Sequence, residues 1–231
     1  MLEFLKKKLM HNKFFSYHVY KTEEFVKRTA DQIEKNSKVL DAGAGLCPYK
    51  KYFRDMDYVS QDFCVNGENE WDFSHIDIKS DVHNMPVEDG AFDYILCTSV
   101  LEHLKYPPQA FQEFSRVLRK KGKIFLVTPL TIEEHHEPFD YYRFTRYGLK
   151  LLAEENNFEI ISIKKQGGFF VFVSQTISSF PHLYFKKKIL ENIFHVILYP
   201  LNFLIAFFCY YLDKVDKTKI AMHYECIFEK K

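Results

Sequence analysis

A short apolar strand is followed by an aspartate and two glycines whose spacing suits a ligand-binding turn. Asp41 comes directly after Val39 and Leu40, and Gly43 and Gly45 follow with one alanine between them. Glycine has no Cβ and adopts positive φ without strain, so the main chain can pass close to a ligand here. We expect a helix after Gly45, whose first backbone N–H groups would point toward the same ligand.

The glycine pattern differs from that of dinucleotide-binding proteins. Their fingerprint, Gly-x-Gly-x-x-Gly, has a third glycine at the position that Pro48 occupies here. This difference disfavours a nicotinamide or flavin cofactor, and the nucleoside must be identified from other residues.

Acidic side chains also end the next two predicted strands. Asp62 lies about 20 residues after the first acid, where a carboxylate can accept both hydroxyl groups of a ribose. Asp81 can accept an exocyclic amino group while Val82 covers a purine. A single Asp is more often a helix cap or a turn residue. In this order, however, the acids predict a ligand with adenine, a free ribose and no pyrophosphate, as in S-adenosylmethionine.

Strands and helices alternate along most of the chain. This rhythm predicts an α/β fold, a Rossmann-like, mostly parallel sheet of seven strands with helices on both faces and an antiparallel last strand. Strands are expected at residues 39–40, 58–62, 76–81, 92–97, 124–129, 158–163 and 221–228, and helices at 20–36, 107–119 and 147–157. Ligands of such sheets bind beyond the carboxyl ends of the strands, where Cys97 and Thr98 also lie.

The predicted organisation has one core interrupted by an insertion. We expect an N-terminal helical segment at 1–36, a ligand-binding core at 37–168, an apolar helical insertion at 169–219 and a final core strand at 220–231. With 32 Lys and Arg against 31 Asp and Glu, the net charge is +1. Such a balance gives no field that would gather a polyanion, so no nucleic-acid partner is expected.

Cysteine usage and the N-terminus indicate the compartment. Five scattered cysteines without a C-x-x-C pair suit a reducing cytoplasm and predict no zinc or redox centre. The basic start, residues 1–8, is not followed by a continuous apolar run, so no signal peptide is expected there.

The ordered motifs from about Lys38 to Gly168 resemble the class I S-adenosylmethionine-dependent methyltransferases, and within them the type 11 group. The matching residues are 39–45, Asp62, 81–93, 100–103 and 114–122. The family pattern often has a further glycine at the position of Cys47. The resemblance implies that the cofactor is S-adenosylmethionine and that its site contains Asp41, Ala42, Gly43, Gly45, Asp62, Phe63, Asp81, Val82, Cys97 and Thr98.

A second motif, residues 134–145, resembles the H-x-x-P-x-D-Y-x-R-x-T segment of a subgroup of bacterial polysaccharide and small-molecule methyltransferases. It follows the fifth strand and should lie over the reacting methyl group. The expected catalytic bases are His135 and His103, and no metal is expected. The expected substrate residues are His136, Asp140, Tyr141 and Arg143. An ion pair between Asp140 and Arg143 is the alternative, and Thr145 is expected to cap the next helix.

The insertion contains about 20 apolar residues at 193–212, the length of a membrane span. A return of the chain to the same sheet argues against a single crossing. Two helices that cover the active site or a dimer interface, and a hairpin that docks on a membrane surface, are the main alternatives.

The sequence therefore predicts a methyltransferase that acts on a small-molecule, glycan or lipid-linked acceptor by O-methylation. It would be cytoplasmic, with peripheral attachment to the inner face of a membrane and a homodimer as open alternatives. The other candidate function is a methyltransferase-like binding or membrane-associated module without catalysis.

Overall fold

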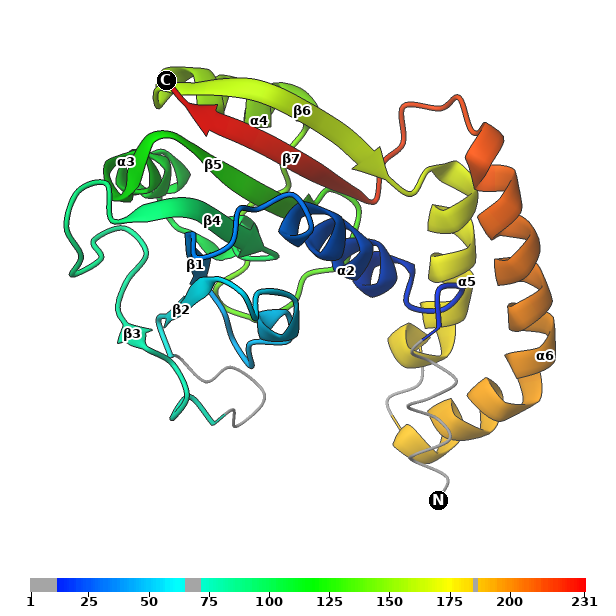
Figure 1. Ribbon diagram of the computed structural model, residues 1–231. Helices are drawn as coiled ribbons and strands as arrows, with labels where there is room; N and C mark the ends of the chain where they lie inside the picture. The colour runs from blue at the N-terminus through cyan, green and yellow to red at the C-terminus, as the bar shows by residue number, and fades with distance from the viewer. Residues whose placement is uncertain (1–11, 65–71, 185–186) are drawn as a thin grey trace. The chain divides into compact units, whose positions relative to one another are not determined.

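Seven strands form one sheet in the computed structural model, which describes residues 12–64, 72–184 and 187–231 without the side chains of residues 182–183 and 188–196. Its strands are β1 (Lys38–Ala42), β2 (Asp57–Asp62), β3 (Ile78–Lys79), β4 (Phe92–Thr98), β5 (Leu118–Pro129), β6 (Phe158–Gln166) and β7 (His223–Lys230). Their order is β3-β2-β1-β4-β5-β7-β6. The first five are parallel, and β7 runs opposite to β6 (Figure 1). The predicted Rossmann-like fold with a reversed last strand is confirmed.

The contacts between residues divide the chain into two compact units. The sheet unit comprises residues 22–164 and 224–231, and the helical unit comprises residues up to 21 together with 165–223. The helices of the sheet unit are α2 (Tyr17–Ala30, which begins in the helical unit), α3 (Pro107–Val117) and α4 (Arg146–Glu155). All three were expected from the sequence, and Thr145 caps α4 by accepting the Gly148 N–H.

Strand register brings the carboxyl ends of three strands to one edge of the sheet. Asp41 of β1 pairs with Leu96 of β4, and Ala42 pairs with Gln61 of β2. The turn after β1 continues this contact, because the N–H groups of Gly43 and Ala44 donate to the Gln61 carbonyl at 2.8 and 2.9 Å. Side chains that end these strands are therefore held close together.

Apolar side chains cover both faces of the sheet. Phe25 and Val26 of α2 form a buried cluster to which Ile227 of β7 contributes. The next residue, Phe228, contacts Phe111 of α3 with ring centroids 6.0 Å apart. Because successive strand residues point to opposite faces, α2 and α3 cover opposite sides of the sheet.

The helix expected directly after the glycine turn is absent. In its place η1 (Lys50–Tyr52) makes one 3-10 turn, and the next α-helix among the described residues is α3. The residue before a proline is disfavoured in the α region, and Cys47, which precedes Pro48, takes a left-handed φ of 50°. No α-helix N-terminus therefore follows this turn within the described residues.

The third strand is shorter than the expected 76–81, and the Asp77 carboxylate just before it is bonded to β2. This carboxylate accepts hydrogen bonds from the backbone N–H and the hydroxyl of Ser60, at 2.9 and 2.7 Å. Strand β3 begins at Ile78, directly after this contact, and contains two residues.

The helical unit contains α5 (Phe169–Tyr184), α6 (Lys188–Leu212) and the short η3 (Asp213–Val215). The Asp213 carboxylate accepts the N–H groups of Gly168 and Val171, and so satisfies donors at the start of α5. The ring of Phe14 contacts Phe203 and Tyr210 of α6, with centroids 5.5 and 5.4 Å apart. Among the described residues, no helix combines the length and the hydropathy that crossing a bilayer requires. The basic residues 1–8 lie outside the described residues.

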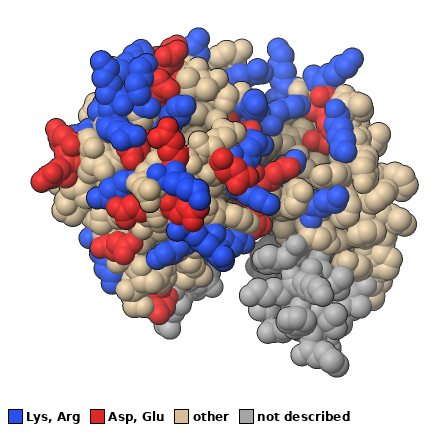
Figure 2. All heavy atoms as spheres, viewed as in Figure 1, with Lys and Arg blue, Asp and Glu red and all other residues tan. Residues whose placement is uncertain are grey.

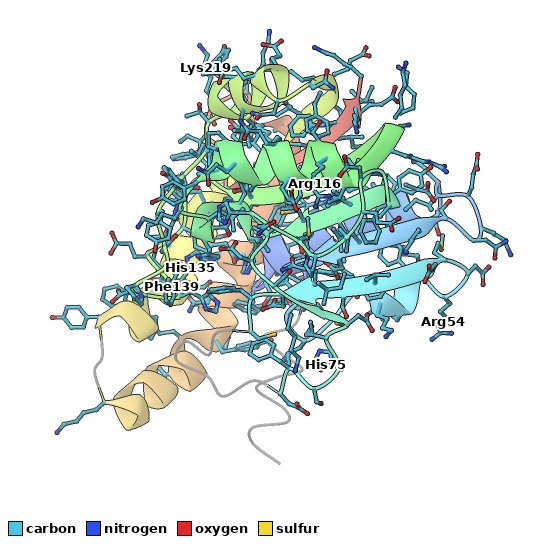
Figure 3. All side chains as sticks on the ribbon, turned by 90° about the vertical axis from the view of Figure 1, so that its left-hand side faces the viewer. Arg54, His75, Arg116, His135, Phe139 and Lys219 are labelled. Carbon is cyan, nitrogen blue, oxygen red and sulfur yellow. The ribbon has the colours of Figure 1, made fainter. Side chains whose placement is uncertain are left out.

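Arg116 on α3 fixes the segment that follows β3 (Figure 3). Its guanidinium donates to the carbonyls of Met85 and Val87 at 3.0 and 2.8 Å. It also pairs with Glu113, whose carboxylate accepts the Met85 N–H at 2.6 Å. These contacts hold residues 81–90 against α3, although residues 80–86 contain little regular structure.

We predict that Arg116→Gln lowers the free energy of unfolding by about 1.5–3 kcal/mol, because it removes charge-assisted hydrogen bonds to backbone carbonyls. Urea denaturation measures this change. The control is Arg119→Gln, since the Arg119 side chain is 57% exposed and forms an ion pair with Asp93. An exposed pair contributes about 0–1 kcal/mol. Equal losses in the two variants would contradict the assigned role of Arg116.

Candidate functional site

A cavity of about 650 Å³ lies at the carboxyl edge of β1, β2 and β4. It is lined by eleven residues that the sequence analysis selected: Asp41, Gly43, Gly45, Asp62, Phe63, Asp81, Val82, Thr98, His103, His136 and Tyr141. Side chains from both predicted motifs thus meet in one hollow of the sheet unit. Its volume falls within the range of about 300–1,000 Å³ that small-molecule sites occupy.

Asp62 at the end of β2 is held in place by backbone donors. One carboxylate oxygen accepts the Gly45 N–H at 2.9 Å, and the other accepts the Cys64 N–H at 2.8 Å. The glycine turn and the second strand are thereby joined directly. Each oxygen keeps a further lone pair, so the carboxylate can still accept hydrogen bonds from a ligand in the cavity.

Asp41 lies at the buried floor of the site. Its side chain accepts a hydrogen bond from the Tyr58 hydroxyl at 2.5 Å. Burial raises the pKa of Asp41 to about 7, a shift that the Tyr58 hydrogen bond opposes and the charge of Asp62 increases. A cationic group in the cavity would favour the ionised form, because opposite charges stabilise each other at low dielectric.

Asp81 and Val82 provide a polar and an apolar group at the third strand end. Asp81 is exposed, and its Oδ1 accepts the backbone N–H of His83 at 2.9 Å. Val82 is buried, with 5% of its surface exposed. This pairing suits an aromatic base whose edge carries a hydrogen-bond donor.

The turn after β1 needs glycine for steric reasons. Gly43 has a φ of +74°, and a Cβ built there would collide with the side chain of Val100. Cys47 also lies in the left-handed region, with a φ of 50°. The loop therefore adopts at Cys47 a conformation that favours glycine, which is the residue often found there in the resembled family.

Five selected residues do not line the cavity. Ala42 and Cys97 are fully buried in β1 and β4, and burial raises the pKa of the Cys97 thiol. His135, Asp140 and Arg143 lie in the loop between β5 and α4. Their binding and catalytic roles therefore stay predictions.

Asp140 and Arg143 form the local ion pair that was the alternative interpretation. The two guanidinium nitrogens Nη1 and Nη2 contact the two carboxylate oxygens at 2.6 and 2.7 Å. Arg143 also donates to the carbonyls of Ile132, Glu133 and Tyr142. These bonds occupy the guanidinium within the loop, and the ion pair holds the pKa of Asp140 well below its usual range.

Three histidines and a glutamate gather beside the cavity. The rings of His103 and His135 pack edge to face with centroids 4.8 Å apart, and His136 lies 5.3 Å from His103. Glu102 is fully buried next to them, and burial raises its pKa to about 7. Burial also lowers the pKa of His103 to about 4, so this imidazole is neutral at pH 7.

The cavity wall includes residues that the sequence analysis did not select. They are Ala44, Leu46, Pro48, Tyr49, Gln61, His83, Ser99, Val100, Leu104, Lys105 and Phe139. Seven of these eleven directly precede or follow a selected residue in the chain, and this adjacency is the signal that could have found them. A second hollow, of about 460 Å³, lies along α4 and β6 and contains none of the motif residues.

A family model described as "Methyltransferase domain" matches residues 14–163. The chain belongs to the methyltransferase domain family. The matched range contains the whole cavity wall, from Asp41 to Tyr141.

Two relatives match parts of this chain. An uncharacterized protein of Methanocaldococcus jannaschii is 28% identical over 143 residues, which are 57% of this chain and 63% of the relative. An uncharacterized 37.1 kDa protein in a Streptomyces fradiae transposon is 41% identical over 49 residues, 21% of this chain and 14% of the relative. The chain thus covers less than two thirds of either relative.

Several solved structures share the fold at low sequence identity. A protein assigned as a sarcosine dimethylglycine methyltransferase from Galdieria sulphuraria has a TM-score of 0.58 at 15% identity, over 92% of this chain and 86% of that one. A SAM-dependent methyltransferase from Methanosarcina mazei has a TM-score of 0.53 at 12% identity, over 88% and 96%. The [4+2]-cyclase SpnF has 0.54 at 16%, over 88% and 80%. Because a cyclase shares it, the fold alone does not determine the reaction.

We predict that Gly43→Ala lowers the free energy of unfolding by about 1–3 kcal/mol, because alanine is strained at this φ and its Cβ meets Val100. Gly148→Ala is the matched control. Gly148 lies inside α4 without a positive φ or a close neighbour, so alanine should stabilise the helix by about 0.5–1 kcal/mol. Urea titration of both variants checks the opposite signs, and a neutral Gly43→Ala would contradict the steric account.

Proposed function

We propose that this methyltransferase domain transfers the methyl group of S-adenosylmethionine to an oxygen atom of a small-molecule, glycan or lipid-linked acceptor. The observation that carries the proposal is the meeting of Asp41, Asp62 and Asp81 in one cavity. These carboxylates come from the ends of three different strands, and they line the cavity together with the glycine turn.

The cavity suits the methyl donor in shape and in chemistry. The missing Cβ at Gly43 lets the turn pack against the Val100 side chain, and both residues line the cavity. When bound, S-adenosylmethionine supplies a methyl group activated by a positively charged sulfonium. A carboxylate at Asp41 complements that charge, and its raised pKa means that ionisation there is sensitive to a nearby cation.

The functional groups at the ends of the second and third strands indicate which parts of the cofactor they would bind. Asp62 would accept the ribose hydroxyls through the oxygen lone pairs left after its two backbone hydrogen bonds. Asp81 would accept an amino group at the edge of the purine, and Val82 would cover its face. Phe63, which is 63% exposed at the cavity wall, adds apolar surface beside the ribose.

The part of the cavity wall that contains His103 favours an acceptor whose nucleophile is oxygen. His103 lines the cavity, and its Nδ1 donates to the Phe139 carbonyl at 3.0 Å, since a carbonyl can only accept. Its Nε2 therefore carries a lone pair that can take a hydroxyl proton. The pKa of His103, which burial lowers to about 4, keeps this nitrogen unprotonated at pH 7. His136 and Tyr141 at the same wall would orient the acceptor, which supports the small-molecule and glycan classes of the resembled subgroup.

We predict that S-adenosylhomocysteine binds the folded protein and that Asp62→Ala weakens this binding about 10–100-fold, because hydrogen bonds to a charged group contribute roughly 1.5–3 kcal/mol. Isothermal titration calorimetry measures both affinities. Asp57→Ala is the control, since Asp57 is an exposed acid at the opposite end of the same strand. Absence of binding by the unsubstituted protein at millimolar ligand would contradict the proposal.

The helical unit carries an apolar stripe that supports a lipid-linked acceptor. Ile197, Leu201, Leu204 and Phe208 recur at helical spacing on α6 and are 52–68% exposed. The opposite side of α6, with Asn202 and Ala206, is buried. The surface over α6 has few charges in the view of Figure 2. An exposed apolar helix face of this kind suits docking in the plane of a membrane surface.

We predict that vesicles of anionic and neutral phospholipid sediment this protein, and that the double variant Leu204→Gln and Phe208→Gln binds them roughly 100-fold less, because burial of a large apolar side chain contributes about 1.5–3 kcal/mol. The control is Tyr147→Gln with Leu151→Gln, which removes an exposed apolar pair from α4. A protein that stays in the supernatant but forms a dimer through the stripe would contradict membrane docking.

A further inference from the structure

We propose that Glu102, His103 and His135 form a binding site for a divalent transition-metal ion of the zinc type, placed at the edge of the cavity. One ligand atom from each of these side chains lies within 4.8 Å of the other two. The set is a glutamate oxygen with two imidazole nitrogens, which is the donor set of several catalytic zinc sites. None of the three was expected to bind a metal from sequence spacing.

Glu102 presents an oxygen that has no other partner. The residue is fully buried, and the Thr128 hydroxyl donates to its Oε2 at 3.2 Å. Its Oε1 is buried without a hydrogen-bond partner and lies 3.9 Å from Nε2 of His103. A buried, unpartnered carboxylate oxygen is costly in a folded protein, and a bound cation removes that cost.

Both histidines present the correct nitrogen. Nδ1 of His103 is 3.0 Å from the Phe139 carbonyl, and Nδ1 of His135 is 3.1 Å from the Glu133 carbonyl. Because carbonyl oxygens only accept, both Nδ1 atoms carry hydrogen and both Nε2 atoms have free lone pairs. A backbone carbonyl behind each ring is the usual arrangement that orients histidine ligands of metals.

The loop that carries His135 is anchored to Glu102. The N–H groups of Tyr141 and Tyr142 donate to the Glu102 carbonyl at 2.9 and 3.1 Å. Asp140 accepts the backbone N–H of His135 at 2.9 Å and neutralises Arg143, the nearby cation. The two chain segments that supply the ligands are therefore fixed to each other before any ion binds.

The spacing of the ligand atoms requires a small closure. Zinc bonds of about 2.0–2.2 Å place tetrahedral ligand atoms about 3.4 Å apart, so the side chains would approach by roughly 1 Å. With three protein ligands, a fourth position stays open. His103 lines the cavity, so that position faces the space assigned to the acceptor. The ion's role rests on the proposed function: with Nε2 of His103 bound to it, the cation would replace His103 as the group that activates the acceptor hydroxyl, by lowering the pKa of that hydroxyl.

The test is metal binding by the full chain after treatment with a chelator, in the absence of any methyl donor. Calorimetric titration with Zn²⁺ and the visible absorption of bound Co²⁺ report affinity and coordination. We expect one site per chain. Glu102→Gln or His135→Ala should weaken it about 100-fold or more, since loss even of a residue that only orients a ligand costs about 10–100-fold.

His75→Gln is the control for adventitious histidine binding, because His75 is exposed and lies away from His135 (Figure 3). Its affinity for Zn²⁺ should equal that of the unsubstituted protein. Glu102→Gln keeps the shape of the side chain and removes a buried charge, so thermal unfolding will show that it is folded. Failure of the chelated protein to bind either ion, or equal binding by all variants, would overturn the proposal. Neither result depends on S-adenosylhomocysteine binding.

Discussion

The parallel register of β1, β2 and β4 is the constraint on which the site depends. It ends three strands at one sheet edge, and the two hydrogen bonds from the glycine turn to the Gln61 carbonyl continue the alignment beyond β1. Asp62 then joins the second strand end to Gly45. Carboxylates about 20 residues apart along the chain thereby share one cavity.

The repeated pattern of strand ends made the fold and half of the cavity wall predictable from the sequence. A strand that ends on Asp41 or Asp62 can be placed in the sheet from the sequence, because the order of strands in such folds is regular. The absence of a helix after Gly45 was not predictable from the glycines. It depends on Cys47 and Pro48, because the residue before a proline is disfavoured in the α region. The contact between Asp77 and Ser60 before the short β3 was not predictable either, because it joins residues 17 positions apart.

In the loop between β5 and α4 the sequence left two interpretations open for Asp140 and Arg143. Its motif places Asp140 and Arg143 at substrate-binding positions by resemblance, yet the guanidinium is bonded to Asp140 and to three backbone carbonyls. The grouping of His135 with Glu102 and His103 depends on how the loop folds back to the Glu102 carbonyl, which spacing does not encode. The position of a buried glutamate beside two imidazoles becomes apparent only in the three-dimensional structure.

The most direct measurement of the central claim is a crystal structure of the protein with S-adenosylhomocysteine. The account predicts that both ribose hydroxyls lie within hydrogen-bond distance of the Asp62 carboxylate, with the adenine between Val82 and the edge of the cavity and its amino group toward Asp81. A ligand bound outside this cavity, or bound within it with the ribose away from Asp62, would contradict the claim that these strand ends form one adenosyl site.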